Sequence, residues 1–143
     1  MADTSIIGAD LGEVTFPVER GKVREFAGAI LDDNPLYQDE RPPVPLTFSM
    51  AQSFWPRTGG DLSKVSINYA MVVHGGQEFE YLRPVHAGDV LEGRTRVADV
   101  YEKEGKRGGT MTFYVFETTF SNQDGQAALI SRNVLIERGA PQG

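Results

Sequence analysis

Thr110-Met111-Thr112-Phe113-Tyr114-Val115-Phe116-Glu117-Thr118-Thr119-Phe120-Ser121 is the stretch that decides the fold. Aromatic and β-branched residues dominate it, and side chains along an extended chain alternate between two faces, so it predicts a long strand. Similar runs surround it and are separated by turn residues at Gly88-Asp89, 105–109 and Asp124-Gly125. These runs predict strands at 72–81, 90–101 and 127–137, with a shorter strand at 13–18. The second half of the chain is therefore expected to form an antiparallel sheet.

Two helices are expected before these strands. Apolar residues recur at helical spacing over 18–31, and they are Val23, Phe26, Ala27, Ile30 and Leu31. Thr47 is a candidate cap for a second helix, which runs through Phe48 to Trp55 before Pro56 interrupts it. The expected fold class is α+β, with a five-stranded antiparallel sheet wrapped around this second, central helix.

The composition is that of an ordinary globular protein. The chain has 143 residues, of which 40% are hydrophobic and 24% charged, so we expect residues 1–143 to form a single domain. No apolar run approaches the roughly 20 residues that a membrane span requires. The N-terminal residues lack the basic and apolar regions of a signal peptide. We therefore expect a cytoplasmic protein that does not bind membranes.

Several kinds of chemistry are disfavoured by the residues that the chain lacks. It has no cysteine and only two histidines, so a disulfide, thiolate catalysis or a Cys- or His-rich metal site is not expected. The net charge of -6 argues against a general nucleic-acid binder, because such affinity comes mostly from neutralising phosphates. We expect no metal, no cofactor and no nucleic-acid partner.

The segment 29–39, Ala-Ile-Leu-Asp-Asp-Asn-Pro-Leu-Tyr-Gln-Asp, contains the strongest functional signal. The first expected helix brings Asp32 to its C-terminal end. Asn34-Pro35 then forces a turn, because proline cannot continue a helix and restricts the residue before it. A carboxylate at such a junction is held by a rigid element and is still exposed.

This segment resembles the D-x-N-P-[IVL]-H-x-D motif of the MaoC-like (R)-specific enoyl-thioester hydratases and 3-hydroxyacyl dehydratases, which have the hotdog fold. In the resemblance Asp32 matches the catalytic Asp, Asn34-Pro35 the turn, Asp39 the trailing acid and Tyr37 the catalytic His. Pro-Leu-Thr-Phe at 45–48 and Gln-Glu-Phe-Glu-Tyr at 77–81 are similar to the MaoC-type dehydratase N-terminal domain branch. That branch includes non-catalytic subunits of heterodimeric (3R)-hydroxyacyl-ACP dehydratases, and the resemblance extends from about residue 15 to 138.

Tyr37 is the departure from the family pattern. A group that abstracts a proton next to a thioester needs a pKa near the working pH, which imidazole has and a phenol, at about 10, does not. Tyr37 is therefore either a core or interface aromatic with a satisfied hydroxyl, or a polar contact in an acyl pocket. Asp32 is either a catalytic carboxylate or a solvated acid at a helix end, and Asn34 is either a turn residue or a substrate ligand.

Other candidate residues lie outside this loop. His74 begins a predicted strand and is a candidate replacement for the missing base, and Gly75 and Gly76 permit close approach of a ligand or partner. Thr47 and Phe48 open the second helix, where free backbone N–H groups can hold a thioester oxygen as it becomes negative. An ordinary helix cap is the alternative for these two residues.

The resemblance implies reversible syn addition of water to a 2,3-enoyl thioester of CoA or acyl carrier protein, without a cofactor. The chain is then a subunit of a hydro-lyase that shapes the acyl pocket, while a catalytic MaoC-like hotdog subunit supplies a complete Asp/His pair. One alternative is a weakly active homodimeric hydratase that uses Asp32 with His74. Another is a non-enzymatic acyl-thioester binding protein, and a hotdog thioesterase is a further alternative because a fold does not fix a reaction.

Overall fold

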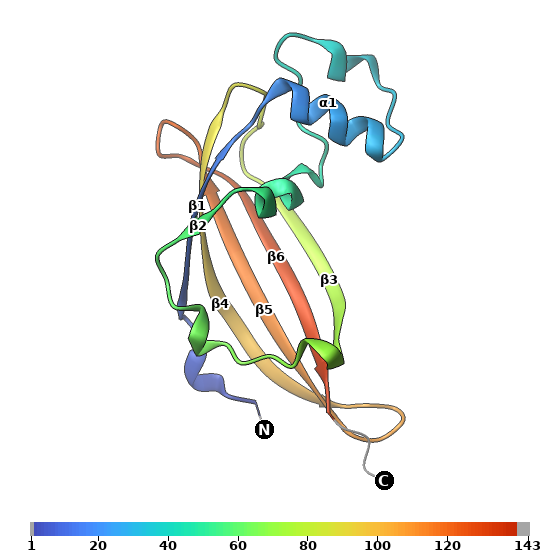
Figure 1. Ribbon diagram of the computed structural model, residues 1–143, viewed down its shortest axis with the longest axis vertical. Coiled ribbons are helices and arrows are strands. Elements are labelled where there is room, and N and C mark those ends of the chain that lie inside the picture. The colour runs from blue at the N-terminus through green and yellow to red at the C-terminus, as the bar shows by residue number, and fades with distance from the viewer. Residues whose placement is uncertain (1, 140–143) are drawn as a thin grey trace.

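One antiparallel sheet forms most of the molecule (Figure 1). The computed structural model describes residues 2–139, so Met1 and 140–143, which the expected domain includes, lie outside the described residues. Within 2–139 the sheet has six strands in the order β2-β1-β4-β5-β6-β3. The strands are β1 (Asp10–Pro17), β2 (Arg57–Thr58), β3 (Val72–Tyr81), β4 (Val90–Glu104), β5 (Thr110–Ser121) and β6 (Ala127–Arg138). The predicted α+β class is confirmed, with one strand more than expected.

The additional strand, β2, depends on a close backbone crossing. Gly12 interrupts the register of β1 against β4 with a bulge and has a φ of 101°. A Cβ at Gly60 would lie 2.2 Å from the Gly12 nitrogen, and a Cβ at Gly12 would lie 2.6 Å from the Gly59 oxygen. Only glycines allow the two segments to approach in this way. The sequence predicts no strand at 57–58, because the contact that forms β2 joins distant parts of the chain.

The first helix, α1 (Arg20–Ala29), is shorter at both ends than the predicted range of 18–31. Val23 and Ala27 form its buried face, which packs against one end of the sheet. Figure 1 shows α1 beyond the end of the strands, with the segment that leads to the next elements folded beside it. No helix within residues 2–139 is long and apolar enough to cross a membrane.

The expected central helix is a 3-10 helix, η3 (Phe48–Phe54). Its hydrogen bonds span three residues, as between the Trp55 N–H and the Gln52 oxygen at 3.0 Å. Seven residues are few for a stable α-helix, and Pro56 disfavours the α conformation at the residue before it. The sheet therefore packs against a short, tight helix. Four further short 3-10 helices are η1 (Thr4–Ile6), η2 (Pro35–Gln38), η4 (Leu62–Lys64) and η5 (Tyr69–Met71).

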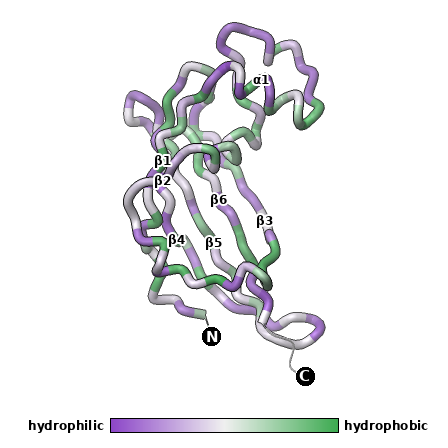
Figure 2. The backbone as a smooth tube through the Cα atoms, in the orientation of Figure 1, coloured by the Kyte–Doolittle hydropathy of each residue, from purple (hydrophilic) through white to green (hydrophobic). Residues whose placement is uncertain are grey.

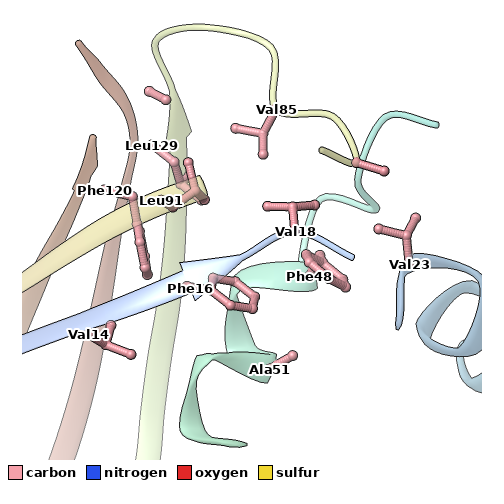
Figure 3. Packing of buried hydrophobic residues seen from close by; sticks show 12 residues of the cluster. Val14, Phe16, Val18, Val23, Phe48, Ala51, Val85, Leu91, Phe120 and Leu129 are labelled. Carbon is pink, nitrogen blue, oxygen red and sulfur yellow. The ribbon is translucent and has the colours of Figure 1, made fainter. Parts of the chain in front are cut away.

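The main apolar core lies where η3 and α1 meet the sheet (Figure 3). Phe16 of β1 is at its centre and contacts three aromatic rings, with centroid distances of 5.5 Å to Phe48, 5.1 Å to Trp55 and 6.2 Å to Phe120. Phe26 of α1 meets Phe48 edge to face at 5.5 Å. Aromatic rings bury large areas and prefer tilted or edge contacts, so this cluster joins the helices to the sheet.

Candidate functional site

The strongest candidate site is a pocket between the C-terminal end of α1 and η2. Its volume is about 380 Å³. The residues that line it are Arg24, Ala27, Gly28, Leu31, Asp32, Asp33, Asn34, Tyr37 and Gln38. Three residues predicted from the sequence, Asp32, Asn34 and Tyr37, are thus brought together. We call this the loop pocket.

A helix-ending turn fixes the backbone at Asp32. Leu31 has a φ of 58°, and its N–H donates to the Gly28 oxygen at 3.1 Å. The Asp32 N–H donates to the Ala27 oxygen at 2.9 Å. These two bonds are those of a Schellman motif, in which glycine normally occupies the position of Leu31. A leucine with positive φ is strained, and its side chain is 90% exposed beside the pocket.

The carboxylate of Asp32 and the amide of Asn34 hold the turn that follows. Asp32 Oδ1 accepts the Asn34 N–H at 3.1 Å, and Asn34 Oδ1 accepts the Leu36 N–H at 3.0 Å. Asn34 thereby caps η2, with Pro35 as its first residue. The turn function of Asn34 is thus seen directly. This polar loop follows the apolar end of α1 in Figure 2.

Arg24 holds the far end of the loop and was not identified from the sequence. Its Nη2 donates to the Gln38 oxygen at 2.7 Å, and its Nε donates to the Tyr37 oxygen at 3.2 Å. Arg24 also precedes Ala27, Gly28 and Leu31 by three, four and seven positions, and all four line the pocket. That spacing places residues on one helix face, so it was a signal available in the sequence.

The hydroxyl of Tyr37 keeps its proton at neutral pH. Burial raises the pKa of Tyr37, and the negative charge of Asp32 and a hydrogen bond to that carboxylate raise it further. Tyr37 also packs against the edge of the main core, as does Tyr81. Burial, with a contribution from Tyr37, raises the pKa of Tyr81 to about 12. Tyr37 can therefore donate a hydrogen bond in this pocket, but it cannot act as a base near pH 7.

His74 is not beside Asp32 within this chain. It is the third residue of β3 and is exposed. Figure 1 shows the start of β3 at the opposite end of the sheet from α1. Gly75 accommodates a neighbouring side chain, because a Cβ there would lie 2.5 Å from Cδ1 of Ile136. A Cβ at Gly76 would meet nothing within 4 Å, so this position is open.

The start of η3 offers fewer free backbone groups than expected. Phe48 is 1% exposed and belongs to the core, and its N–H donates to the Pro45 oxygen at 2.9 Å. The side chain of Thr47 makes no capping hydrogen bond. An N–H that already has a backbone acceptor has little capacity to hold a thioester oxygen. Thr47 is the N-cap residue of η3, as predicted, but it caps the helix without a side-chain hydrogen bond.

Together these side chains form an incomplete acid-base site. Asp32 presents a carboxylate, Tyr37 presents a phenol that retains its proton, and Arg24 holds the far end of the loop through the oxygens of Tyr37 and Gln38. Neither histidine of the chain lines the pocket. The pocket can orient a polar group of a ligand through hydrogen bonds, but it contains no imidazole, the side chain whose ordinary pKa lies near 7.

The chain is similar to known proteins over most of its length. A family model described as "FAS1-like, dehydratase domain region" matches residues 5–130. A UPF0336 protein of Thermobifida fusca (strain YX) is 33% identical over 142 residues, which cover 90% of this chain and 88% of that protein. The C-terminally truncated HadBC (3R-hydroxyacyl-ACP dehydratase) complex of Mycobacterium tuberculosis contains a similar chain. Its TM-score is 0.70 at 24% identity, with 92% of this chain and 96% of that chain covered. A MaoC-like dehydratase has a TM-score of 0.75 at 22% identity, over 95% of this chain and 43% of that one.

Proposed function

Because the chain belongs to the family of FAS1-like dehydratase domain regions and the expected MaoC-like hotdog fold is confirmed, we propose that it is a dehydratase subunit. The reaction is the reversible hydration of a 2,3-enoyl thioester to the (R)-3-hydroxyacyl thioester. This chain shapes the acyl-binding part of the assembly, and a second hotdog subunit supplies a complete Asp/His pair.

The protonation state of Tyr37 supports the assignment of catalysis to a second subunit. At the position where the family motif has histidine, the loop pocket holds a phenol whose pKa is raised above its ordinary value by burial and by Asp32. General-base catalysis at neutral pH needs a group that is unprotonated there and lies within hydrogen-bond reach of the proton. A chain without that group needs another subunit for the chemical step.

Exposed apolar side chains beside the loop pocket support a protein partner. Leu31 is 90% exposed, Leu36 is 51% exposed and Ile30 is 47% exposed, and all three lie within the loop segment 29–39. Grouped exposed apolar residues are typical of interaction surfaces. β3 also leaves one edge of the sheet unpaired within the described residues, and such an edge can pair with another strand. HadBC, which shares the fold, is itself a complex.

The direct test compares the chain alone with a two-subunit complex. We expect the purified chain to hydrate crotonyl-CoA at least about a hundredfold more slowly than a complex with a small hotdog protein that has an intact D-x-N-P-I-H loop. Light scattering establishes whether the two proteins associate. Rapid hydration by this chain alone, abolished by His74→Ala, would contradict the proposal and assign the base to His74.

A substitution within the loop tests whether the retained scaffold is catalytic. Tyr37→His should restore measurable hydration by the single chain, because an imidazole then lies opposite Asp32 in the pocket. The gain should vanish in the Tyr37→His, Asp32→Asn double variant. If Tyr37→His folds and binds an acyl-CoA without any gain, the loop does not serve catalysis and a binding role is favoured.

A further inference from the structure

A row of polar side chains crosses the inward face of the sheet, which is otherwise mostly apolar. Thr95 of β4, Thr118 of β5 and Ser131 of β6 are cross-strand neighbours and are 7%, 6% and 4% exposed. The Oγ1 atoms of Thr95 and Thr118 are 2.7 Å apart, and Gln77 of β3 donates through Nε2 to Ser131 Oγ at 2.7 Å. Buried polar groups reduce stability unless they are paired, so a row of polar side chains that crosses four strands is unusual inside a core.

Arg57 of β2 lies at one end of this row and has no acidic partner among residues 2–139. Its Nη1 donates to Thr95 Oγ1 at 2.7 Å, and its Nη2 donates to Gln52 Oε1 at 3.4 Å. Within residues 2–139, no carboxylate oxygen lies within 4 Å of the Arg57 guanidinium, the distance that an ion pair requires. Burial lowers the pKa of Arg57, which remains far above neutrality. Arg57 is exposed as a residue, although its hydrogen bond to Thr95 is partly buried, and a cation with only neutral partners favours the approach of an anion.

A cavity of about 270 Å³ connects Arg57 with the other end of the row. It lies between the sheet and the segment that joins β2 to β3, which crosses in front of the strands in Figure 1. Gln77 and Asn133 are among the residues that line it, and their buried side-chain oxygens, Oε1 and Oδ1, have no hydrogen-bond partner within residues 2–139. The cavity therefore offers a positive charge at one end and hydrogen-bond acceptors at the other.

We propose that this cavity, the Arg57 pocket, binds a short organic acid that places its carboxylate on Arg57 and a hydroxyl group on Asn133. The carboxylate supplies the negative charge that the described residues do not, and it can accept hydrogen bonds from the guanidinium. The hydroxyl has one hydrogen and donates it to Asn133 Oδ1, whose desolvation is otherwise uncompensated. Leu11, Val65 and Phe116 line the space between and contact the methylene groups.

The dimensions of the pocket suit a chain of about six carbons. Arg57 donates to Thr95 on β4, and Asn133 lies two strands away on β6, so a strand spacing of about 4.8 Å gives roughly 10 Å between the two ends. A water molecule occupies about 30 Å³ in the liquid, so the cavity has room for roughly nine non-hydrogen atoms if each takes the volume of one water molecule. 6-Hydroxyhexanoate has the required groups at the required separation.

Binding of three probes of equal length tests the proposal. Calorimetric titration of the full chain compares 6-hydroxyhexanoate with hexanoate, which lacks the hydroxyl, and with hexane-1,6-diol, which lacks the charge. We expect 6-hydroxyhexanoate to bind at least about tenfold more tightly than either, since one charge-assisted hydrogen bond accounts for a factor of this size. Equal binding of the three probes, or no binding at about 10 mM, overturns the proposal because water then fills the pocket.

Variants identify the side chains responsible. Arg57→Gln should weaken the binding of 6-hydroxyhexanoate at least about tenfold, so that its affinity equals that of hexane-1,6-diol. Arg57→Lys should keep part of the preference for 6-hydroxyhexanoate over the diol. Asn133→Leu should remove the preference for 6-hydroxyhexanoate over hexanoate. Arg94→Gln is the matched control, because it removes the same charge from an exposed arginine on β4 that pairs with Glu13 at 2.9 Å. Circular dichroism of each variant verifies folding, and unchanged binding by a folded Arg57→Gln contradicts the assignment.

Ligand binding in the Arg57 pocket does not depend on dehydratase activity of the chain. The Arg57 pocket and the loop pocket have no lining residue in common. The probes carry no thioester, so their binding does not depend on hydration activity. Failure of the crotonyl-CoA assay and failure of the titration are therefore separate outcomes.

Discussion

Replacing Arg24 by methionine should loosen the loop pocket while leaving the sheet intact. The guanidinium donates to the Gln38 oxygen at 2.7 Å and the Tyr37 oxygen at 3.2 Å, and a third contact to Asp39 at 3.4 Å is long. Methionine keeps an apolar stem but removes all of these donors. Hydrogen bonds from a charged donor stabilise by about 1.5–3 kcal/mol when shielded from water.

The expected loss is smaller than that range because the loop is exposed to solvent. Counting the two shorter bonds at about 0.5–1 kcal/mol each predicts a loss of about 1–2 kcal/mol in the free energy of unfolding. For a chain of this length that corresponds to a decrease in Tm of roughly 3–8 °C.

Urea denaturation followed by the fluorescence of Trp55, the single tryptophan, measures the global effect. Amide hydrogen exchange locates it, and we expect faster exchange at Asn34 and Leu36 but unchanged exchange in β5. Arg20→Met is the matched control on the same helix, since Arg20 makes no side-chain hydrogen bond or ion pair within residues 2–139. Equal stability and equal exchange in the two variants would refute the role given to Arg24.

Leu31→Gly should raise the free energy of unfolding by up to about 1 kcal/mol, because glycine removes the strain of φ 58° but gains entropy in the unfolded chain. A clear decrease in the free energy of unfolding, measured by urea denaturation, would show that the exposed leucine stabilises the chain. Gly60→Ala should destabilise by more than about 2 kcal/mol, since its Cβ would lie 2.2 Å from the backbone nitrogen of Gly12, and wild-type stability would exclude the backbone crossing. Tyr81 has a pKa of about 12 in the folded protein and an ordinary value of 10.0 when unfolded, so its contribution is complete below pH 10 and is lost as the pH rises to 12. Tyr81→Phe should therefore flatten the alkaline stability curve, and an unchanged slope between pH 10 and 12 would contradict this.

Local pattern predicted the long strands well. The ranges 72–81 and 110–121 match β3 and β5, because alternation and β-branched residues act within each stretch. β4 extends to Glu104, three residues beyond the predicted end, since pairing with β5 continues up to the hairpin tip. The helix of 18–31 was predicted too long because its final residues adopt a turn in which Leu31 occupies a position typical of glycine.

Contacts between distant segments account for the parts that the sequence did not predict. β2 exists because Gly60 crosses Gly12, and neither residue signals the other locally. The motif singled out Asp32, Asn34 and Tyr37, which line one pocket in the structure, whereas Arg24 reaches that pocket from the preceding helix. The Arg57 pocket was not predicted either, because its polar side chains come from five strands and from η3, and they look like ordinary alternation in each strand.

The strand order β2-β1-β4-β5-β6-β3 has a consequence for how the chain folds. β4, β5 and β6 are consecutive and joined by short hairpins, so their pairing closes small loops at low entropic cost. β1 and β3 join later in this scheme, because Phe16 pairs with Leu91 and Phe79 with Ser131 across long sequence separations. We expect substitutions in the meander to slow folding, and substitutions in β1 or β3 mainly to speed unfolding. Both pockets would then be completed only after the rate-limiting barrier, since each depends on segments outside the meander.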